Sequence, residues 1–177
     1  MRFSKLLTVG VCALGLSAGA VLSAQAGSVK VEGTRFTLDV PQGWNPGYKD
    51  TDKLFMFYVK DPASGSALEG VYLRGQQAKT FTMGDFKKAR VSGEDKRYEG
   101  KGHKVVKEGA VTVGGEKGVY LHTTWKDGGK DMEKHTALML KDGERYLVVM
   151  SGQKGKVDKK VFDHAVSSFA LVSDKKK

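Results

Sequence analysis

The chain has 177 residues, and its 30 Lys and Arg residues outnumber its 20 Asp and Glu residues, which gives a formal net charge of +10 at pH 7. This length indicates a single domain that is large enough to bury an ordinary hydrophobic core. The only cysteine, Cys12, lies in the apolar N-terminal segment. The rest of the chain therefore excludes disulfides, thiolate nucleophiles and thiolate-bound metal ions.

The first 26 residues have the three-part layout of a secretory signal peptide. A short cationic start with Arg2 and Lys5 precedes an uncharged, largely apolar run, and Ala24-Gln25-Ala26 provides the small residues that a signal peptidase accepts. We therefore predict a signal peptide at residues 1–26 and a periplasmic or extracellular protein with no transmembrane segment after cleavage. A retained anchor is the alternative, because the uncharged run approaches the roughly 20 residues of a spanning helix.

Alternating apolar and polar residues predict β-strands along most of the mature chain. The predicted strands cover residues 29–31, 36–40, 54–60, 68–74, 105–106, 110–113, 118–126, 131–141 and 145–151. Two segments have helical periodicity instead, namely residues 83–97, which follow a Thr82-x-x-Asp85 cap, and residues 156–170. This order predicts one mostly antiparallel α+β domain at residues 27–172, followed by a basic tail at 173–177.

The Gly128-Gly129 pair predicts a two-residue hairpin turn, because both central residues of such a turn need a positive φ. This turn places His122 opposite His135 and Trp125 opposite Met132. A slip of one residue would move every apolar side chain of the strand to the other face. The hydrophobic pattern therefore supports this register.

The same register, extended through an Asp142-Gly143 turn, makes both faces of the central strands apolar. One face has Leu121, Leu138, Leu140, Leu147 and Val149, and the other has Tyr120, Ala137, Met139, Tyr146, Val148 and Met150. A sheet that is apolar on both sides must be covered on both sides. We therefore predict an antiparallel β-sheet flanked by helices on both faces, an α/β/α sandwich.

Three potential metal ligands, His122, Glu133 and His135, fall on one face of the predicted hairpin. Directly opposed residues have Cβ atoms roughly 5 Å apart, within reach of a shared ion. Two histidines and a glutamate suit zinc or another divalent metal ion. They are therefore candidate metal ligands, and the alternative is the ordinary polar end of a hairpin.

The remaining polar residues are assigned to the surface and not to a specific site. Charged residues of the first predicted helix are assigned to a solvated face: Lys87, Lys88, Glu94, Asp95 and Lys96. His103 and His164 are interpreted as surface or helix-face residues. No serine stands in a Gly-x-Ser-x-Gly elbow, so we predict no catalytic residue, although a hydrolase stays open. Residues 151–156 fail the phosphate-binding-loop pattern, because Met150 and Val157 stand where Gly and Ser or Thr are needed, so we predict no cofactor-binding residue.

Positive charge is concentrated in two segments. Residues 79–107 have nine Lys and Arg against four Asp and Glu, and a second cluster runs from Lys154 to Lys177. In an exported protein, this charge favours an envelope protein or an anionic envelope component as the partner, in preference to nucleic acid. The alternative is that the lysines simply keep the surface solvated.

Two segments carry a family resemblance. Residues 36–44 form an aromatic strand that runs into Pro-x-x-Trp, and residues 145–151 form an apolar strand before a helix that leads to Ser168-Phe169. In these features the chain resembles the PsbP-like family, whose fold is shared by DcrB-type bacterial envelope proteins. The resemblance implies an antiparallel sheet between helical layers and a binding or assembly role without catalytic residues.

These features together predict a non-enzymatic exported binding or assembly protein of the cell envelope. It would dock to a protein or an anionic partner through a basic surface. A periplasmic metal-binding protein that uses His122 and His135 is the alternative.

Overall fold

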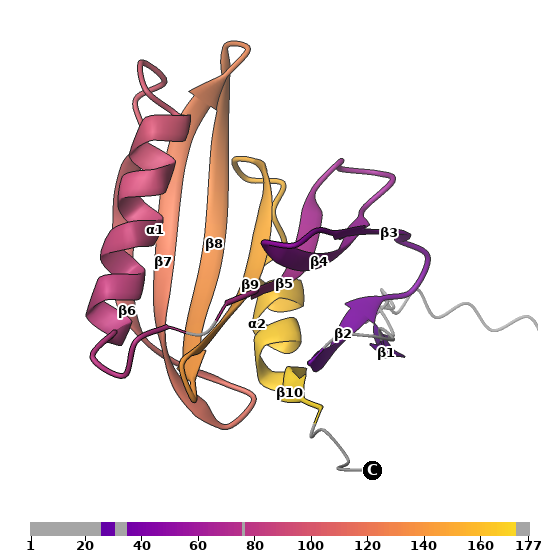
Figure 1. Ribbon diagram of the computed structural model, residues 1–177. Coiled ribbons are helices and arrows are strands. Elements are labelled where there is room, and N and C mark those ends of the chain that lie inside the picture. Colours follow the sequence, from indigo (N-terminus) through magenta and orange to yellow (C-terminus); the bar gives the residue numbers. More distant parts are fainter. Residues whose placement is uncertain (1–25, 31–34, 76, 173–177) are drawn as a thin grey trace, which may run out of the picture.

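The computed structural model describes residues 26–30, 35–75 and 77–172 (Figure 1). In chain order these form β1 (Ala26–Lys30), β2 (Phe36–Pro41), β3 (Asn45–Asp50), β4 (Leu54–Lys60), β5 (Ala67–Leu73), α1 (Met83–Arg97), β6 (Lys104–Val113), β7 (Glu116–Asp127), β8 (Lys130–Lys141), β9 (Glu144–Gln153), α2 (Lys159–Ser168) and β10 (Ala170–Leu171). The mostly antiparallel α+β class is confirmed. Apart from Ala26, the predicted signal peptide lies outside the described residues, and so does the predicted tail.

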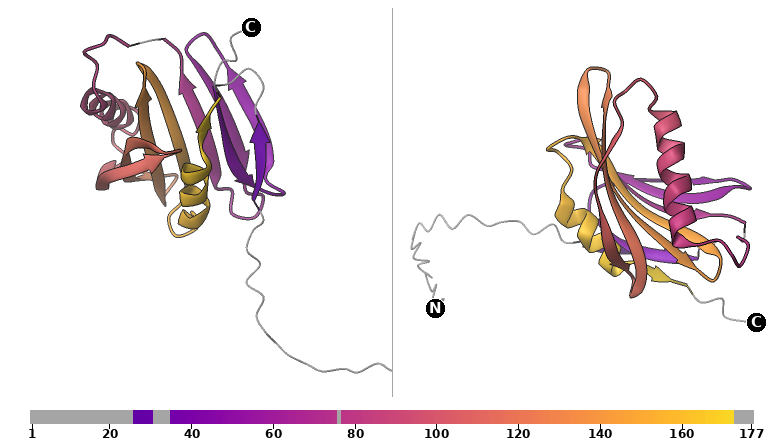
Figure 2. Two further views of the ribbon diagram at one scale, coloured as in Figure 1. Left: turned by 90° about the horizontal axis from the view of Figure 1, so that it is seen from below. Right: turned by 90° about the vertical axis from the view of Figure 1, so that its left-hand side faces the viewer.

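The strands form two antiparallel sheets. Seven of them have the order β3-β4-β5-β9-β8-β7-β6, and the other three have the order β1-β2-β10. The small sheet lies beside α2 on one side of the large sheet (Figure 2). The sequence predicted one sheet, but β2 pairs with β1 and β10 and packs on a face of the large sheet instead of joining its edge.

Both central hairpins have the predicted register. The β7–β8 pairing places His122 opposite His135, and the β8–β9 pairing places Leu138 opposite Leu147. The turn residues Gly128 and Gly129 have φ values of 55° and 77°, as this turn requires. Turn chemistry therefore determines which side chains share a face in this part of the sheet.

Two strands differ from their predictions. β3 was not predicted, because Pro46 and Gly47 interrupt its sequence and because, as an exposed edge strand, it has no apolar alternation. β6 is one continuous strand where two short ones were predicted. Its pairing with β7 shifts between Val105 and Lys107, and the extra residue at this irregularity breaks the alternation.

The two helices begin at capping residues. Thr82 accepts a hydrogen bond from the Asp85 backbone N–H, and the Asp85 side chain accepts one from the Thr82 backbone N–H, which confirms the predicted cap of α1. α2 is shorter than predicted, since Asp158 caps its start and β10 follows its end. Neither helix in the described part of the chain is long and apolar enough to cross a membrane.

Each face of the large sheet has its own hydrophobic core. α1 contributes Phe86 to a cluster with Val71, Leu121, Leu138, Leu147 and Val149. The other cluster combines Phe162, Ala165 and Val166 of α2 with Phe36, Leu38 and Val40 of β2 and with Ala137, Met139 and Val148 of the large sheet. Gly70 permits this approach, because a Cβ there would lie 2.5 Å from the Phe36 ring.

Candidate functional site

His122, Glu133 and His135 lie together, as the register predicts, on the α2 side of the β7–β8 hairpin. One potential ligand atom from each residue lies within 4.8 Å of the others. The two imidazole rings stack with their centroids 4.5 Å apart and their planes 18° apart. We call these three residues the histidine cluster.

Hydrogen bonds hold two members of the histidine cluster in place. The Glu133 carboxylate accepts a hydrogen bond from the Gly155 backbone N–H at 2.8 Å, and its other oxygen lies 3.2 Å from Nε2 of His122. The hydroxyl of Tyr120 lies 2.7 Å from Nδ1 of His135. A partner on one imidazole nitrogen orients the ring and sets the tautomer, as second-shell groups do in metal sites.

Burial sets the charge of His135. The residue is 5% exposed, and the Phe162 ring of α2 lies 5.6 Å away. Burial, and after it the charge of neighbouring His122, lower the pKa of His135. The neutral imidazole, which is the form that binds metal ions, is therefore favoured.

The ring geometry sets a condition for metal binding. Imidazole lone pairs lie in the ring plane, and two nearly parallel stacked rings do not aim them at one point. Zinc needs nitrogen atoms at about 2.0–2.1 Å in a tetrahedral arrangement. His122, whose side chain is 22% exposed, has to rotate for both rings to bind one ion, whereas Glu133 and His135 are already held.

Under α1, the structure contradicts the predicted solvated face at Glu94, which is 4% exposed. Its carboxylate lies 2.9 Å from Nζ of Lys134 and 2.7 Å from Nη2 of Arg90. Burial alone would raise the pKa of Glu94, but the charges of Arg90 and Lys134 and the Lys134 hydrogen bond together lower it. Lys134 lies on a core-facing position of β8, and a buried ammonium needs a counter-ion. Glu94 of α1 provides it.

His103 also differs from its prediction as a surface residue. Its side chain is 3% exposed, with Nδ1 2.7 Å from Asp95 and Nε2 3.3 Å from Glu94. Its ring stacks on Tyr98 at 5.6 Å between centroids. Glu94, His103 and Lys134 thus form a buried ionic cluster. The sequence contained one sign of it, because Lys134 occupies a position in β8 where the alternating pattern calls for an apolar residue.

Aromatic rings complete the surroundings of Lys134. Its ammonium lies 4.8 Å from the centre of the Tyr98 ring and 5.0 Å from the Trp125 ring. It also donates a hydrogen bond to the Tyr98 hydroxyl at 3.0 Å. These contacts replace part of the hydration that Lys134 loses on burial.

A pocket of about 190 Å³ lies at the β7–β8 turn end of the sheet, where Trp125 and Asp131 belong to its lining. Three exposed lysines line it: Lys104, Lys126 and Lys154. None of these lysines forms an ion pair with a residue that the structure describes. We call this region, together with exposed Lys101 and Lys130, the basic tip.

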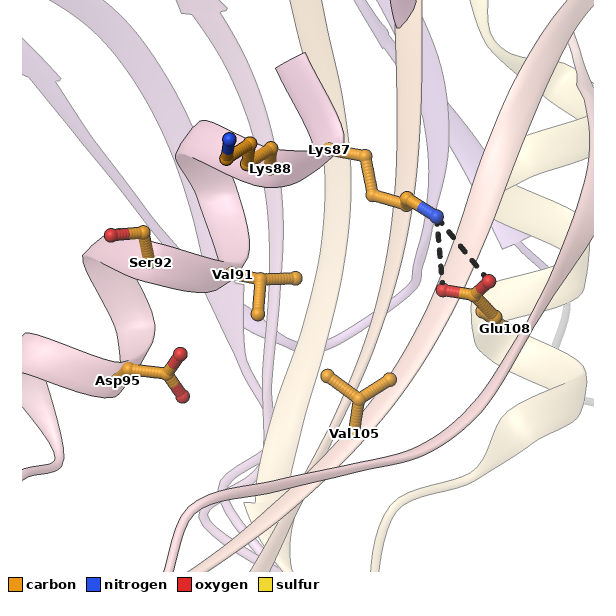
Figure 3. A pocket seen from close by; sticks show the side chains of 7 residues that line it. All are labelled: Lys87, Lys88, Val91, Ser92, Asp95, Val105 and Glu108. Carbon is orange, nitrogen blue, oxygen red and sulfur yellow. Dashed lines mark hydrogen bonds and ion pairs between the residues drawn. The ribbon is translucent and has the colours of Figure 1, made fainter. Parts of the chain in front are cut away.

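Two larger pockets, each of about 360 Å³, flank α1. The pocket between α1 and β6 is shown in Figure 3, where Val105 lies below the ion pair of Lys87 with Glu108 and Val91 lies to its left. The pocket on the other flank of α1, the arginine pocket, is lined by Arg90, Arg97 and Arg145 among others.

These elements define a PsbP-like α+β domain. The solution structure of cyanobacterial PsbP (CyanoP) from Synechocystis is similar over 93% of this chain and 99% of that chain, with 15% identity and a TM-score of 0.65. A crystal structure from Bacteroides thetaiotaomicron is similar over 86% of this chain and 51% of that chain, with 13% identity and a TM-score of 0.57. The predicted PsbP-like resemblance is thus confirmed for the fold.

The sequence family is more specific. Residues 29–171 match the family described as the serine/threonine kinase C-terminal domain, and the chain therefore belongs to this family. No curated protein sequence matches the chain.

Proposed function

We propose that this chain is a non-enzymatic exported binding or assembly protein of the cell envelope, formed by a single domain at residues 27–172. It docks to an anionic partner through the basic tip. The observation that carries the proposal is the set of three exposed lysines, without counter-ions among the described residues, around one pocket.

Few of the acidic residues that the structure describes lie close enough to neutralise the lysines of the basic tip. Lys101 is paired with Asp127 at 2.7 Å, and Asp131 is the one acidic residue that lines the pocket. An anionic group at the pocket would therefore meet an excess of positive charge. Because exposed charges are screened over about 10 Å at 0.1 M salt and about 3 Å at 1 M, such binding must weaken with salt.

The test measures retention of partners on the immobilised mature protein. We expect envelope extracts to yield a partner that is retained at low salt and released at high salt. Protease treatment of the extract distinguishes a protein partner from an anionic envelope component. Retention that is absent, or that does not depend on salt, contradicts the proposal.

A matched pair of variants locates the surface. Lys104→Glu/Lys126→Glu/Lys154→Glu should lose the salt-sensitive retention. The control, Lys49→Glu/Lys53→Glu/Lys60→Glu, makes the same change in net charge at exposed lysines near the opposite edge of the sheet. Equal retention by both variants would show that the basic tip is not the docking surface.

The second candidate function is divalent metal binding by the histidine cluster. The proximity of three ligand atoms, with Glu133 and His135 already held by hydrogen bonds, supports it. Titration with zinc, copper and nickel, followed by calorimetry, should show binding that His122→Ala/His135→Ala abolishes. His164→Ala, at an exposed position on α2, is the control, and identical binding by wild type and the double variant ends this candidate.

A further inference from the structure

The arginine pocket is separate from both sites described above. It lies between α1 and the β5–β9 part of the sheet, with Leu73 and Arg145 on the sheet side and Phe86, Arg90 and Arg97 on the helix side. Its volume of about 360 Å³ lies in the range of roughly 300–1,000 Å³ that small-molecule sites occupy. The pocket is therefore large enough for a small ligand.

The three guanidinium groups retain donors that no described residue uses. Arg90 gives Nη2 to Glu94 at 2.7 Å, and Arg145 gives Nη2 to the backbone oxygen of Arg74 at 3.2 Å. The Nε atoms of both Arg90 and Arg145 are buried and have no acceptor among the described residues. A guanidinium has five N–H donors in a planar fork, so each of these two arginines keeps donors without a partner among the described residues.

Charge in this region is positive overall. Glu94 lines the pocket and Glu69 is close to it, but the Glu94 carboxylate is shared between Arg90 and buried Lys134. Burial raises the pKa of Glu69, although Arg90, Lys134 and Arg97 act in the opposite direction. Even with both carboxylates ionised, the three arginines of the pocket and Lys134 leave an excess of positive charge.

The same pocket has an apolar side and free space beside the helix. Leu73 and Phe86 supply the apolar surface. Gly93 also lines the pocket, and a Cβ at this position would have no atom within 4 Å. A residue without a side chain thus leaves room between the apolar surface and the charged groups.

We propose that the arginine pocket binds a carboxylate carried on a short apolar stem. The carboxylate takes the planar donors of Arg97 and Arg145, which match its geometry. The stem lies over Gly93 against Leu73 and Phe86. Such a group belongs either to a free small acid or to the C-terminus of a peptide that ends in an apolar residue.

Calorimetric titration of the mature protein distinguishes these sources. The probes are octanoate, with octanol as its neutral analogue, and the peptide Ala-Ala-Leu with a free C-terminus, with its amidated form as the neutral analogue. Binding of octanoate or of the free peptide, in preference to its neutral analogue, supports the proposal and identifies the source. Failure of both acids to bind, or equal binding of each acid and its neutral analogue, overturns it.

Two variants test the pocket itself. Arg97→Gln/Arg145→Gln should weaken binding about tenfold or more, because charge-assisted hydrogen bonds are lost. Gly93→Leu should abolish binding by filling the pocket, while the thermal midpoint stays the same or rises, since leucine is a better helix former than glycine.

The control for the charge change is Lys88→Gln/Lys96→Gln, at exposed positions of the same helix that do not line this pocket. This variant should bind as wild type does. The proposal is overturned if folded Gly93→Leu binds with wild-type affinity. It is also overturned if Lys88→Gln/Lys96→Gln loses as much affinity as Arg97→Gln/Arg145→Gln, because either result places the ligand elsewhere.

Discussion

Replacement of Glu94 by Gln should destabilise the protein more than replacement of Lys134 by Met. Both residues are 4% exposed and contact each other at 2.9 Å, but their other partners differ. Glu94 also contacts Arg90 and His103, whereas Lys134 contacts no other carboxylate within the described part of the chain. Removing Glu94 leaves a buried ammonium without an anion, and removing Lys134 leaves a carboxylate with two partners.

The magnitudes follow from this difference. Loss of one partner from a buried ion pair costs about 3–5 kcal/mol, which is the expectation for Glu94→Gln. Lys134→Met keeps the packing against the Tyr98 and Trp125 rings, so its cost should be about 1.5–3 kcal/mol, the range of a hydrogen bond to a charged group. The double variant should cost less than the sum, because it leaves no unpaired ammonium.

Equilibrium unfolding in urea, followed by fluorescence and circular dichroism, measures all three free energies of unfolding. Coincident transitions from the two probes establish that the two-state treatment applies. A cost of Lys134→Met as large as that of Glu94→Gln, or single effects that add, would contradict the assigned partners. Either result would mean that Lys134 does not depend on Glu94 for its charge balance.

Three further outcomes follow from the structure. The pKa of Glu94 is lowered in the folded state, so its ionised form stabilises the fold at pH values above the ordinary pKa of 4.5. This contribution is lost as the pH falls through the lower folded-state pKa. Wild type should therefore lose more unfolding free energy on acidification than Glu94→Gln. Gly70→Ala should lower the free energy of unfolding by about 1–3 kcal/mol, because the added Cβ would lie 2.5 Å from Phe36, and an unchanged urea midpoint would contradict this packing. Phe162→Ala should cost about 3–5 kcal/mol in the same assay, since the ring is 1% exposed in the core under α2, and a cost below 1 kcal/mol would show that the core is not formed there.

The central hairpins could be predicted because residues close together in the sequence determine their register. Gly128-Gly129 and Asp142-Gly143 determine two turns, and the turns determine which side chains face each other. The proximity of His122 to His135 follows directly from the first turn.

The rest depends on contacts between residues distant in sequence. Glu94 and Lys134 are 40 positions apart, and no periodicity within α1 indicates that its glutamate turns toward β8. The irregular pairing between Val105 and Lys107 likewise conceals the continuity of β6. The arginine pocket was not foreseen because Arg145 reaches it from another segment of the chain.

The two helices are attached to the sheet in different ways, and this difference bears on where a ligand can act. α2 buries Phe162, Ala165 and Val166, whereas α1 buries Phe86 and Glu94. An element that fully buries one apolar side chain, and is otherwise held by partly buried Met83 and Val91 and an ionic cluster, should open at a lower free energy than one held by a continuous apolar face. Amide hydrogen exchange should therefore be faster in α1 than in α2. Since the arginine pocket is built between α1 and the sheet, a bound carboxylate should slow exchange in α1 selectively, which connects occupancy of the pocket to the stability of this helix.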